Sequence, residues 1–209
     1  VVVAALLCAY PVAYVIARMR SHWSMILLAT VVISSFITVV IKALGLIIIF
    51  GTDGPINSVL LNFALVDRPI KIIGNISGVV IGLMNYVLGF MILMLFSVIQ
   101  TIPRSLEEAA EIHGSSRWRV FYRVVIPLSL PGVFGGSMIV FNLCMGAFVS
   151  AALLGGGRVL TLPVVIERTI VLDGEYAMGG ALSAILLIVV LIINILSVMA
   201  VGRMRTLRT

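Results

Sequence analysis

The stretch Glu107–Pro127, which reads EEAAEIHGSSRWRVFYRVVIP, is a polar island between two long apolar runs. It holds three acids, three arginines and a glycine, whereas the segments before and after it are almost entirely aliphatic. Such flanks belong in lipid rather than in water. The charged segment between these two apolar runs must therefore lie in a loop outside the lipid, where it can contact another molecule or surface.

The composition places the whole chain in a membrane. It is 62% hydrophobic and 11% charged, with a mean hydropathy of +1.26, far from the balance of soluble proteins. Five apolar stretches cover Val1–Ala17, Met25–Phe50, Ile72–Ile99, Gly132–Leu154 and Ala181–Val201. Each is about as long as a helix needs to cross ~30 Å of hydrocarbon, the first at the short limit. Their continuous apolarity favours helices over barrel strands, which alternate in facing. The sequence predicts an all-α membrane protein.

The distribution of basic residues predicts the orientation. One side holds nine of them, namely Arg18, Arg20, Arg104, Arg117, Arg119, Arg123, Arg203, Arg205 and Arg208. The other side holds Arg68, Lys71, Arg158 and Arg168, mixed with Asp53, Asp67, Glu167, Asp173 and Glu175. The positive-inside rule therefore places the polar island and the C-terminus in the cytoplasm. The net charge of +6 reflects this topology and does not indicate nucleic-acid binding.

We interpret residues 1–209 as a single transmembrane domain that contains a cytoplasmic loop over residues 101–131. The chain begins inside an apolar run without methionine, so we expect a further helix ahead of the five visible ones. The alternative, that Val1–Ala17 is an uncleaved signal segment, lacks the usual basic residues in front. Cys8 and Cys144 lie within apolar runs and have no disulfide or metal-ligand spacing, so we expect no metal site and no cofactor.

Within the loop, the residues predict two short helices joined by a sharp bend. Ser105 and Glu108 fit a capping box, and Gly114 can end the first helix in a left-handed conformation. Ser115 or Ser116 would cap the second helix, and Pro127 would stop it. The second helix would carry four apolar side chains on one face, namely Trp118, Phe121, Tyr122 and Val125.

Two functions fit this loop. Ala109, Ala110 and Gly114 form a thin ridge flanked by charges, which suits insertion into a groove of a partner protein. Alternatively, the arginines and aromatics of the second helix could rest on anionic lipid headgroups. Three acids beside the ridge fit the lipid interpretation less well.

The spacing of the loop resembles the EAA signature of ABC importer permeases. Glu108-Ala109-Ala110 is followed after three residues by Gly114 and after nine more by Val124-Val125-Ile126-Pro127, where the family has Ile-x-Leu-Pro. The segments Ala9–Tyr14, Ile102–Leu106, Leu128–Gly132 and Leu153–Gly157 add to the resemblance, which covers nearly the whole chain and points to the spermidine/putrescine branch.

The resemblance implies the transmembrane domain of a type I ABC importer in a bacterial inner membrane, with five visible helices of six. Its partners would be ABC ATPase subunits, a second permease subunit and a periplasmic or lipid-anchored solute-binding protein. The residues implied to couple to the ATPase are Glu107, Glu108, Ala109, Ala110, Glu111, Gly114, Arg117 and Pro127. The chain has no GxxxxGK[ST] phosphate loop, so a partner must hydrolyse the ATP.

The solute pathway gives weaker signals. Lys42 lies within an apolar run, where it could meet solute but more simply reaches to the outer interface. Asn85, Tyr86, Asn142 and Ser150 could line a pathway, or they could bond to neighbouring helices, as could Asn194. Because no dense polar pocket is evident, we predict a weakly selective passage with specificity held by the binding protein. Iron, sulfate, phosphonate and thiamine permeases remain alternatives to polyamine.

A membrane enzyme or an ion-coupled secondary transporter is the competing class. No acid lies in any predicted span, so a proton relay is not evident, and His22 and His113 lack metal spacing.

Elsewhere, Gly74, Gly78 and Gly82 recur every fourth position and predict a helix-packing face. Leu162–Leu172 predicts a short interfacial helix.

Overall fold

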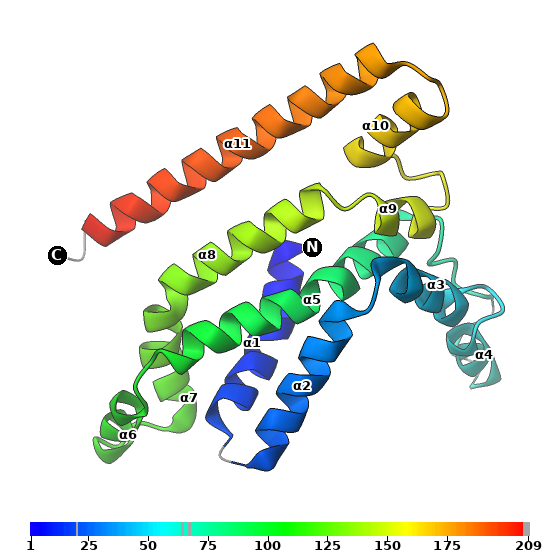
Figure 1. The fold of residues 1–209 in the computed structure, drawn as a ribbon. Helices are drawn as coiled ribbons and strands as arrows, with labels where there is room; N and C mark the ends of the chain where they lie inside the picture. The colour runs from blue at the N-terminus through cyan, green and yellow to red at the C-terminus, as the bar shows by residue number, and fades with distance from the viewer. Residues whose placement is uncertain (20, 64, 67, 207–209) are drawn as a thin grey trace. The chain divides into compact units, whose positions relative to one another are not determined.

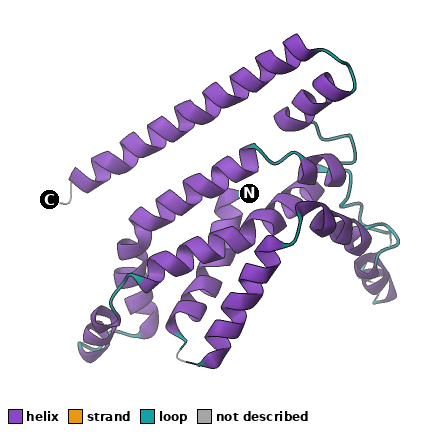
Figure 2. Ribbon diagram, viewed as in Figure 1, coloured by secondary structure: helices purple, strands orange, loops and turns teal. Residues whose placement is uncertain are grey.

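The computed structural model describes the backbone of residues 1–19, 21–63, 65–66 and 68–206, with side chains as far as residue 199. Of the charges used to predict orientation, Arg20, Asp67 and Arg208 lie outside the described residues, as do the side chains of Arg203 and Arg205. Every regular element in the described part is helical (Figures 1 and 2).

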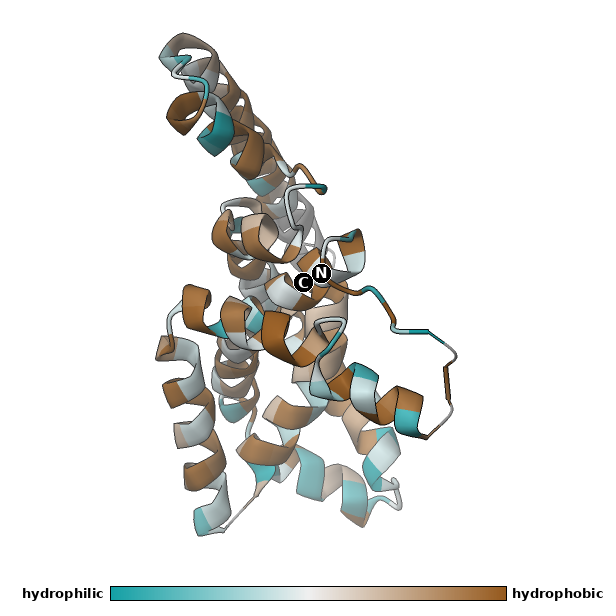
Figure 3. Cartoon of the chain, turned by 90° about the vertical axis from the view of Figure 1, so that its right-hand side faces the viewer, coloured by the Kyte–Doolittle hydropathy of each residue, from teal (hydrophilic) through white to brown (hydrophobic). Residues whose placement is uncertain are grey.

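The helices follow in the order α1 (Val2–Arg18), α2 (His22–Phe36), α3 (Val39–Phe50), α4 (Pro55–Asn62), α5 (Ile76–Gln100), α6 (Arg104–Ile112), α7 (Arg117–Val120), the π-helix η1 (Phe121–Val125), α8 (Ile126–Met145), α9 (Val149–Leu154), α10 (Leu162–Val171) and α11 (Tyr176–Thr206). Helix α10 confirms the short helix predicted from residue 162. Hydrophobic residues dominate the long helices, and hydrophilic ones gather in the short connections (Figure 3).

Among the described residues, four stretches are long and apolar enough to cross a membrane: Val39–Asn62, Ile76–Gln100, Arg117–Met145 and Tyr176–Met199. Helices α1 and α2 are apolar but shorter, with 17 and 15 residues. The predicted all-α membrane class is confirmed. Four stretches of the described chain reach spanning length where we predicted five, because α1 is shorter, and the bounds differ most for Met25–Phe50 and Gly132–Leu154.

The apolar run Met25–Phe50 is not one helix, contrary to our prediction. It divides between α2 and α3, with Thr38 in an extended conformation at ψ 141°. The Ser35 hydroxyl donates to the Val31 carbonyl at 2.8 Å within the preceding turn, and the β-branched Ile37 and Thr38 follow it. Such back-bonding and branching weaken a helix locally, so hydropathy alone could not locate the break.

The predicted span Gly132–Leu154 also differs. Helix α8 starts earlier, at Ile126, and ends at Met145, so that residues 146–148 separate it from α9. Pro127 does not stop a helix as we predicted, because the chain stays helical from Arg117 to Met145 through η1. The wider π-helical turn ends at Val125, two residues before the proline, where the proline ring would otherwise crowd the carbonyls of the preceding turn.

By their contacts the residues form two compact units. One combines Phe36–Val87 with Asn142–Ile195, and the other combines Val2–Ser35 with Leu88–Phe141. The single domain over 1–209 stays a prediction.

In the second unit the buried residues recur every fourth position, as Ala5, Ala9, Ala13 and Ala17 on α1 and Met91, Leu95 and Ile99 on α5. Helix α1 therefore packs through a stripe of alanines, which permits close approach of its neighbours.

In the first unit, the glycines at the start of α5 gather around Leu154. Gly78 and Gly82 lie on α5 and leave no room for a Cβ beside Leu154. Gly74 is not on the helix, contrary to our prediction. It precedes α5 at φ 81°, and its N–H donates to the Leu154 carbonyl at 2.8 Å. Gly78 and Gly82 thus have the packing role that the spacing predicted, while Gly74 contacts the end of α9 through a backbone hydrogen bond.

Replacing Gly78 with alanine should destabilise the protein. A Cβ there would lie 2.7 Å from the Ile72 carbonyl oxygen and 3.0 Å from that of Leu154, and both are backbone atoms that move little. Overpacking of this kind costs about 1–3 kcal/mol, so we expect a lower midpoint of thermal unfolding in detergent. Gly45→Ala is the matched control, because nothing lies within 4 Å of that Cβ and alanine favours a helix. Equal midpoints for both variants would contradict this contact.

Candidate coupling loop

Helix α6 ends as its sequence predicts. Gly114 has φ 80°, in the left-handed region that favours glycine. Its N–H donates to the Glu111 carbonyl at 2.9 Å, and the Ser115 N–H donates to the Ala110 carbonyl at 3.1 Å. These two bonds form a Schellman motif, which satisfies the last carbonyls of the helix and turns the chain sharply. The predicted bend at Gly114 is confirmed.

The start of α6 differs from the prediction. The helix begins at Arg104, with Pro103 at the N-cap and no side-chain capping bond, so the predicted capping box of Ser105 and Glu108 is wrong. Pro103 has φ −59°, which suits entry into a helix, and the helix therefore begins before the serine is reached. Ser105 instead lies inside the first turn.

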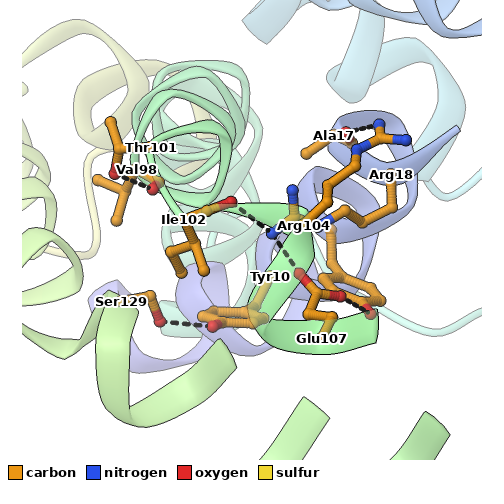
Figure 4. A network of polar contacts seen from close by, with 10 residues as sticks. Tyr10, Ala17, Arg18, Val98, Thr101, Ile102, Arg104, Glu107 and Ser129 are labelled. Atoms are coloured by element: carbon orange, nitrogen blue, oxygen red, sulfur yellow. Dashed lines mark hydrogen bonds and ion pairs between the residues drawn. The ribbon is translucent and has the colours of Figure 1, made fainter. Parts of the chain in front are cut away.

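Glu107 faces the protein rather than solvent. Its carboxylate pairs with the Arg18 guanidinium at the end of α1, and only 13% and 14% of the two side chains are exposed. The Tyr14 hydroxyl donates to the other carboxylate oxygen at 3.2 Å. Figure 4 shows Glu107 reaching toward α1 in this network. Among the acids of the loop, Glu107 is the one that the fold buries.

Most of the other residues of α6 are exposed, although Arg104 also bonds to α1. Glu108, Ala109 and Glu111 are exposed, Ala110 is half-buried, and Ile112 is 84% exposed. The ridge of small residues with flanking acids is thus open to a partner. Glu111 also lies 3.8 Å from Arg117 across the bend, an exposed pair that contributes little to stability.

The segment after the bend carries an aromatic cluster. Phe121 packs edge-on against Tyr10 and Tyr14 of α1, with ring centroids 5.5 and 4.9 Å apart. Trp118 and Tyr122 remain 73% and 61% exposed. The predicted single face of four apolar side chains is therefore divided, because Phe121 and the buried Val125 face the protein while the other two face outward.

The residues considered for a pathway differ in their burial and in their contacts. Asn142 and Asn194 exchange two hydrogen bonds, of 3.1 and 2.8 Å, between α8 and α11. Ser150 is buried and packs beside Gly82, so its position suits helix packing. Asn85 is exposed and Tyr86 is half-buried on α5. A role in lining the pathway stays a prediction for all four residues.

Comparison with known proteins decides the family. Residues 2–205 match the model of the binding-protein-dependent transport system inner membrane component. The chain belongs to this family. It is 33% identical over 178 residues to the spermidine/putrescine permease PotB of Haemophilus influenzae and 33% identical over 186 residues to PotB of Escherichia coli. These alignments cover 85% and 89% of this chain.

The chain spans 62% of the length of the Haemophilus protein and 68% of that of the Escherichia protein. A solved bacterial alginate ABC transporter, in complex with a pentasaccharide-bound periplasmic protein, includes a chain with a TM-score of 0.74. That match covers 92% of this chain and 70% of the other at 19% identity, and it shows a shared fold. The chain thus has the fold of an ABC transporter permease.

Sequence reasoning missed the partners of Glu107. From the sequence, Arg18 was used only as a basic residue that indicates membrane orientation. Tyr14 was used only as part of the segment that resembles the permease family. A signal was present, since Tyr10, Tyr14 and Arg18 recur every fourth residue on α1 and so form a polar stripe on an otherwise apolar helix.

Proposed function

We propose that this chain is the permease subunit of an ATP-driven, binding-protein-dependent importer, and that it forms the membrane pathway for a polyamine such as spermidine or putrescine. The family match supports the permease role, and the PotB relatives support the solute. The observation that carries the proposal is the outward face of α6, which ends in a glycine bend at the position that the EAA spacing predicts.

The family match and the outward face of α6 support the proposed partners. Separate ATPase subunits would dock on α6 from the cytoplasm. A second permease subunit would complete the pathway, and a binding protein would deliver solute from outside. In this scheme, closure of the ATPase subunits moves α6, and the attached helices switch the passage between inward-facing and outward-facing states.

Reconstitution tests this function. The full-length subunit, assembled in vesicles with its ATPase and binding protein, should accumulate radiolabelled spermidine only when ATP and the binding protein are both present. Sulfate and 2-aminoethylphosphonate serve as alternative solutes. Uptake driven by an ion gradient without ATP would contradict the importer, and preference for either anion would contradict the polyamine assignment.

A further inference from the structure

We propose that Glu107 is a positioning residue that holds α6 against α1. When the outward face of α6 moves with the ATPase, α1 would therefore move with it. The inference rests on the proposed function but assigns Glu107 a different role from its outward-facing neighbours. It would act within the subunit and not on the ATPase.

The first observation is the burial of the pair. A carboxylate and a guanidinium that are each nearly nine-tenths shielded from water interact more strongly than an exposed pair, and loss of either partner leaves a charge without compensation. Tyr14 donates to the same carboxylate from one turn earlier on α1, so Glu107 is held from two positions on that helix. Two contacts with α1 restrict the orientation of the Glu107 side chain as well as its distance from that helix.

The second observation is a pair of arginine-to-carbonyl hydrogen bonds between the end of α1 and the start of α6. Arg18, at the end of α1, donates to the Ile102 carbonyl at 3.2 Å, just before α6 begins. Arg104, at the start of α6, donates to the Ala17 carbonyl at 3.1 Å in the last turn of α1. The Ala17 carbonyl lies in the last turn of α1, where a cation is favoured, and the Ile102 carbonyl lies in the connection between α5 and α6. Figure 4 shows these bonds beside Glu107.

The third observation is a hollow that adjoins these polar bonds. A hollow of about 660 Å³ lies between the C-terminal half of α1 and the residues of α6 and α7. Its walls include Val15 and Met19 on one side and Trp118 on the other. Tyr14, Arg18 and Glu107 also line this hollow, so the polar bonds between α1 and α6 lie at its wall.

The network also continues past α1. The Tyr10 hydroxyl lies 2.6 Å from that of Ser129 on α8, and Ser129 is fully buried. Tyr10, Tyr14 and Arg18 share one face of α1, so that this helix has polar contacts with both α6 and α8.

The test is the number of ATP molecules hydrolysed per solute imported, measured with the complete transporter in vesicles. In Glu107→Gln we expect the ATPase to co-purify as in the unchanged protein, while ATP used per solute rises at least about fivefold, the lower range of typical coupling between sites. The exchange Arg18→Glu with Glu107→Arg restores the pair and should recover part of the coupling. Glu175→Gln, an exposed acid in the other unit, is the matched control.

If Glu107→Gln fails to insert, Tyr14→Phe removes a single bond to the same carboxylate and should show a smaller change of the same sign. An unchanged ATP-to-solute ratio in Glu107→Gln, or in Tyr14→Phe when it is the variant that inserts, would overturn the inference. So would failure of the exchanged pair to recover any coupling. Loss of ATPase co-purification from the unchanged protein would instead refute the proposed function, which keeps the two failures distinct.

Discussion

Uptake should fall below about a tenth of its normal rate when Gly114 is replaced by proline, at an unchanged level of subunit in the membrane. Proline fixes φ near −65°, whereas Gly114 has φ 80°, and proline also removes the N–H that bonds to Glu111. A backbone penalty of about 3 kcal/mol lowers the population of the bent form more than about a hundredfold. Uptake of labelled solute and membrane content are measured together.

Two alanine variants, at Gly114 and at Gly174, distinguish loss of the α6 bend from the general effect of backbone strain. Gly114 and Gly174 both have positive φ, 80° and 70°, and neither has an atom within 4 Å of an added Cβ. Alanine at either site carries a similar penalty of about 1–2 kcal/mol. We expect Gly114→Ala to lower uptake and Gly174→Ala, in the connection between α10 and α11, to preserve it. Equal losses would show that the bend has no special role.

Reversal of charge at Glu108 should release the ATPase. This side chain is exposed on α6, unlike the buried Glu107 beside it. Since opposed like charges at a protein interface cost several kcal/mol, we expect Glu108→Lys to reduce co-purification of the ATPase about tenfold or more, and uptake with it. Detergent extracts analysed by affinity purification give the measurement.

Glu175→Lys is the control for this charge reversal, because it changes an exposed acid far along the sequence in the same way. It should leave co-purification intact. Normal recovery of the ATPase with Glu108→Lys would argue that the outward face of α6 is not the docking surface.

The sequence predicted those features that depend on local chemistry. Continuous apolar runs indicate helices in lipid, and Gly114 between two short polar segments indicates a bend, because few other residues tolerate positive φ. The exposed ridge at Ala109 followed from the same local pattern. These conclusions need no knowledge of distant contacts.

The errors arose where distant residues decide the outcome. Glu107 looks like its neighbour Glu108, and only the folded position of α1 distinguishes the buried acid from the exposed one. Pro127 usually signals a helix end, yet the π-helical turn before it lets the helix continue. The break after Phe36 lies within a run that hydropathy scores as uniform, so the apolar pattern did not indicate it.

A cross-link from α6 to the ATPase tests the central claim most directly. A cysteine replaces Ala109 in a subunit whose Cys8 and Cys144 have been changed to serine, and the assembled transporter carries single cysteines in the ATPase surface. We predict a rapid cross-link between the two proteins under oxidising conditions, with a rate that changes when ATP is added. Accessibility of the cysteine only from outside the membrane, or cross-linking to lipid reagents with none to the ATPase, would contradict the account.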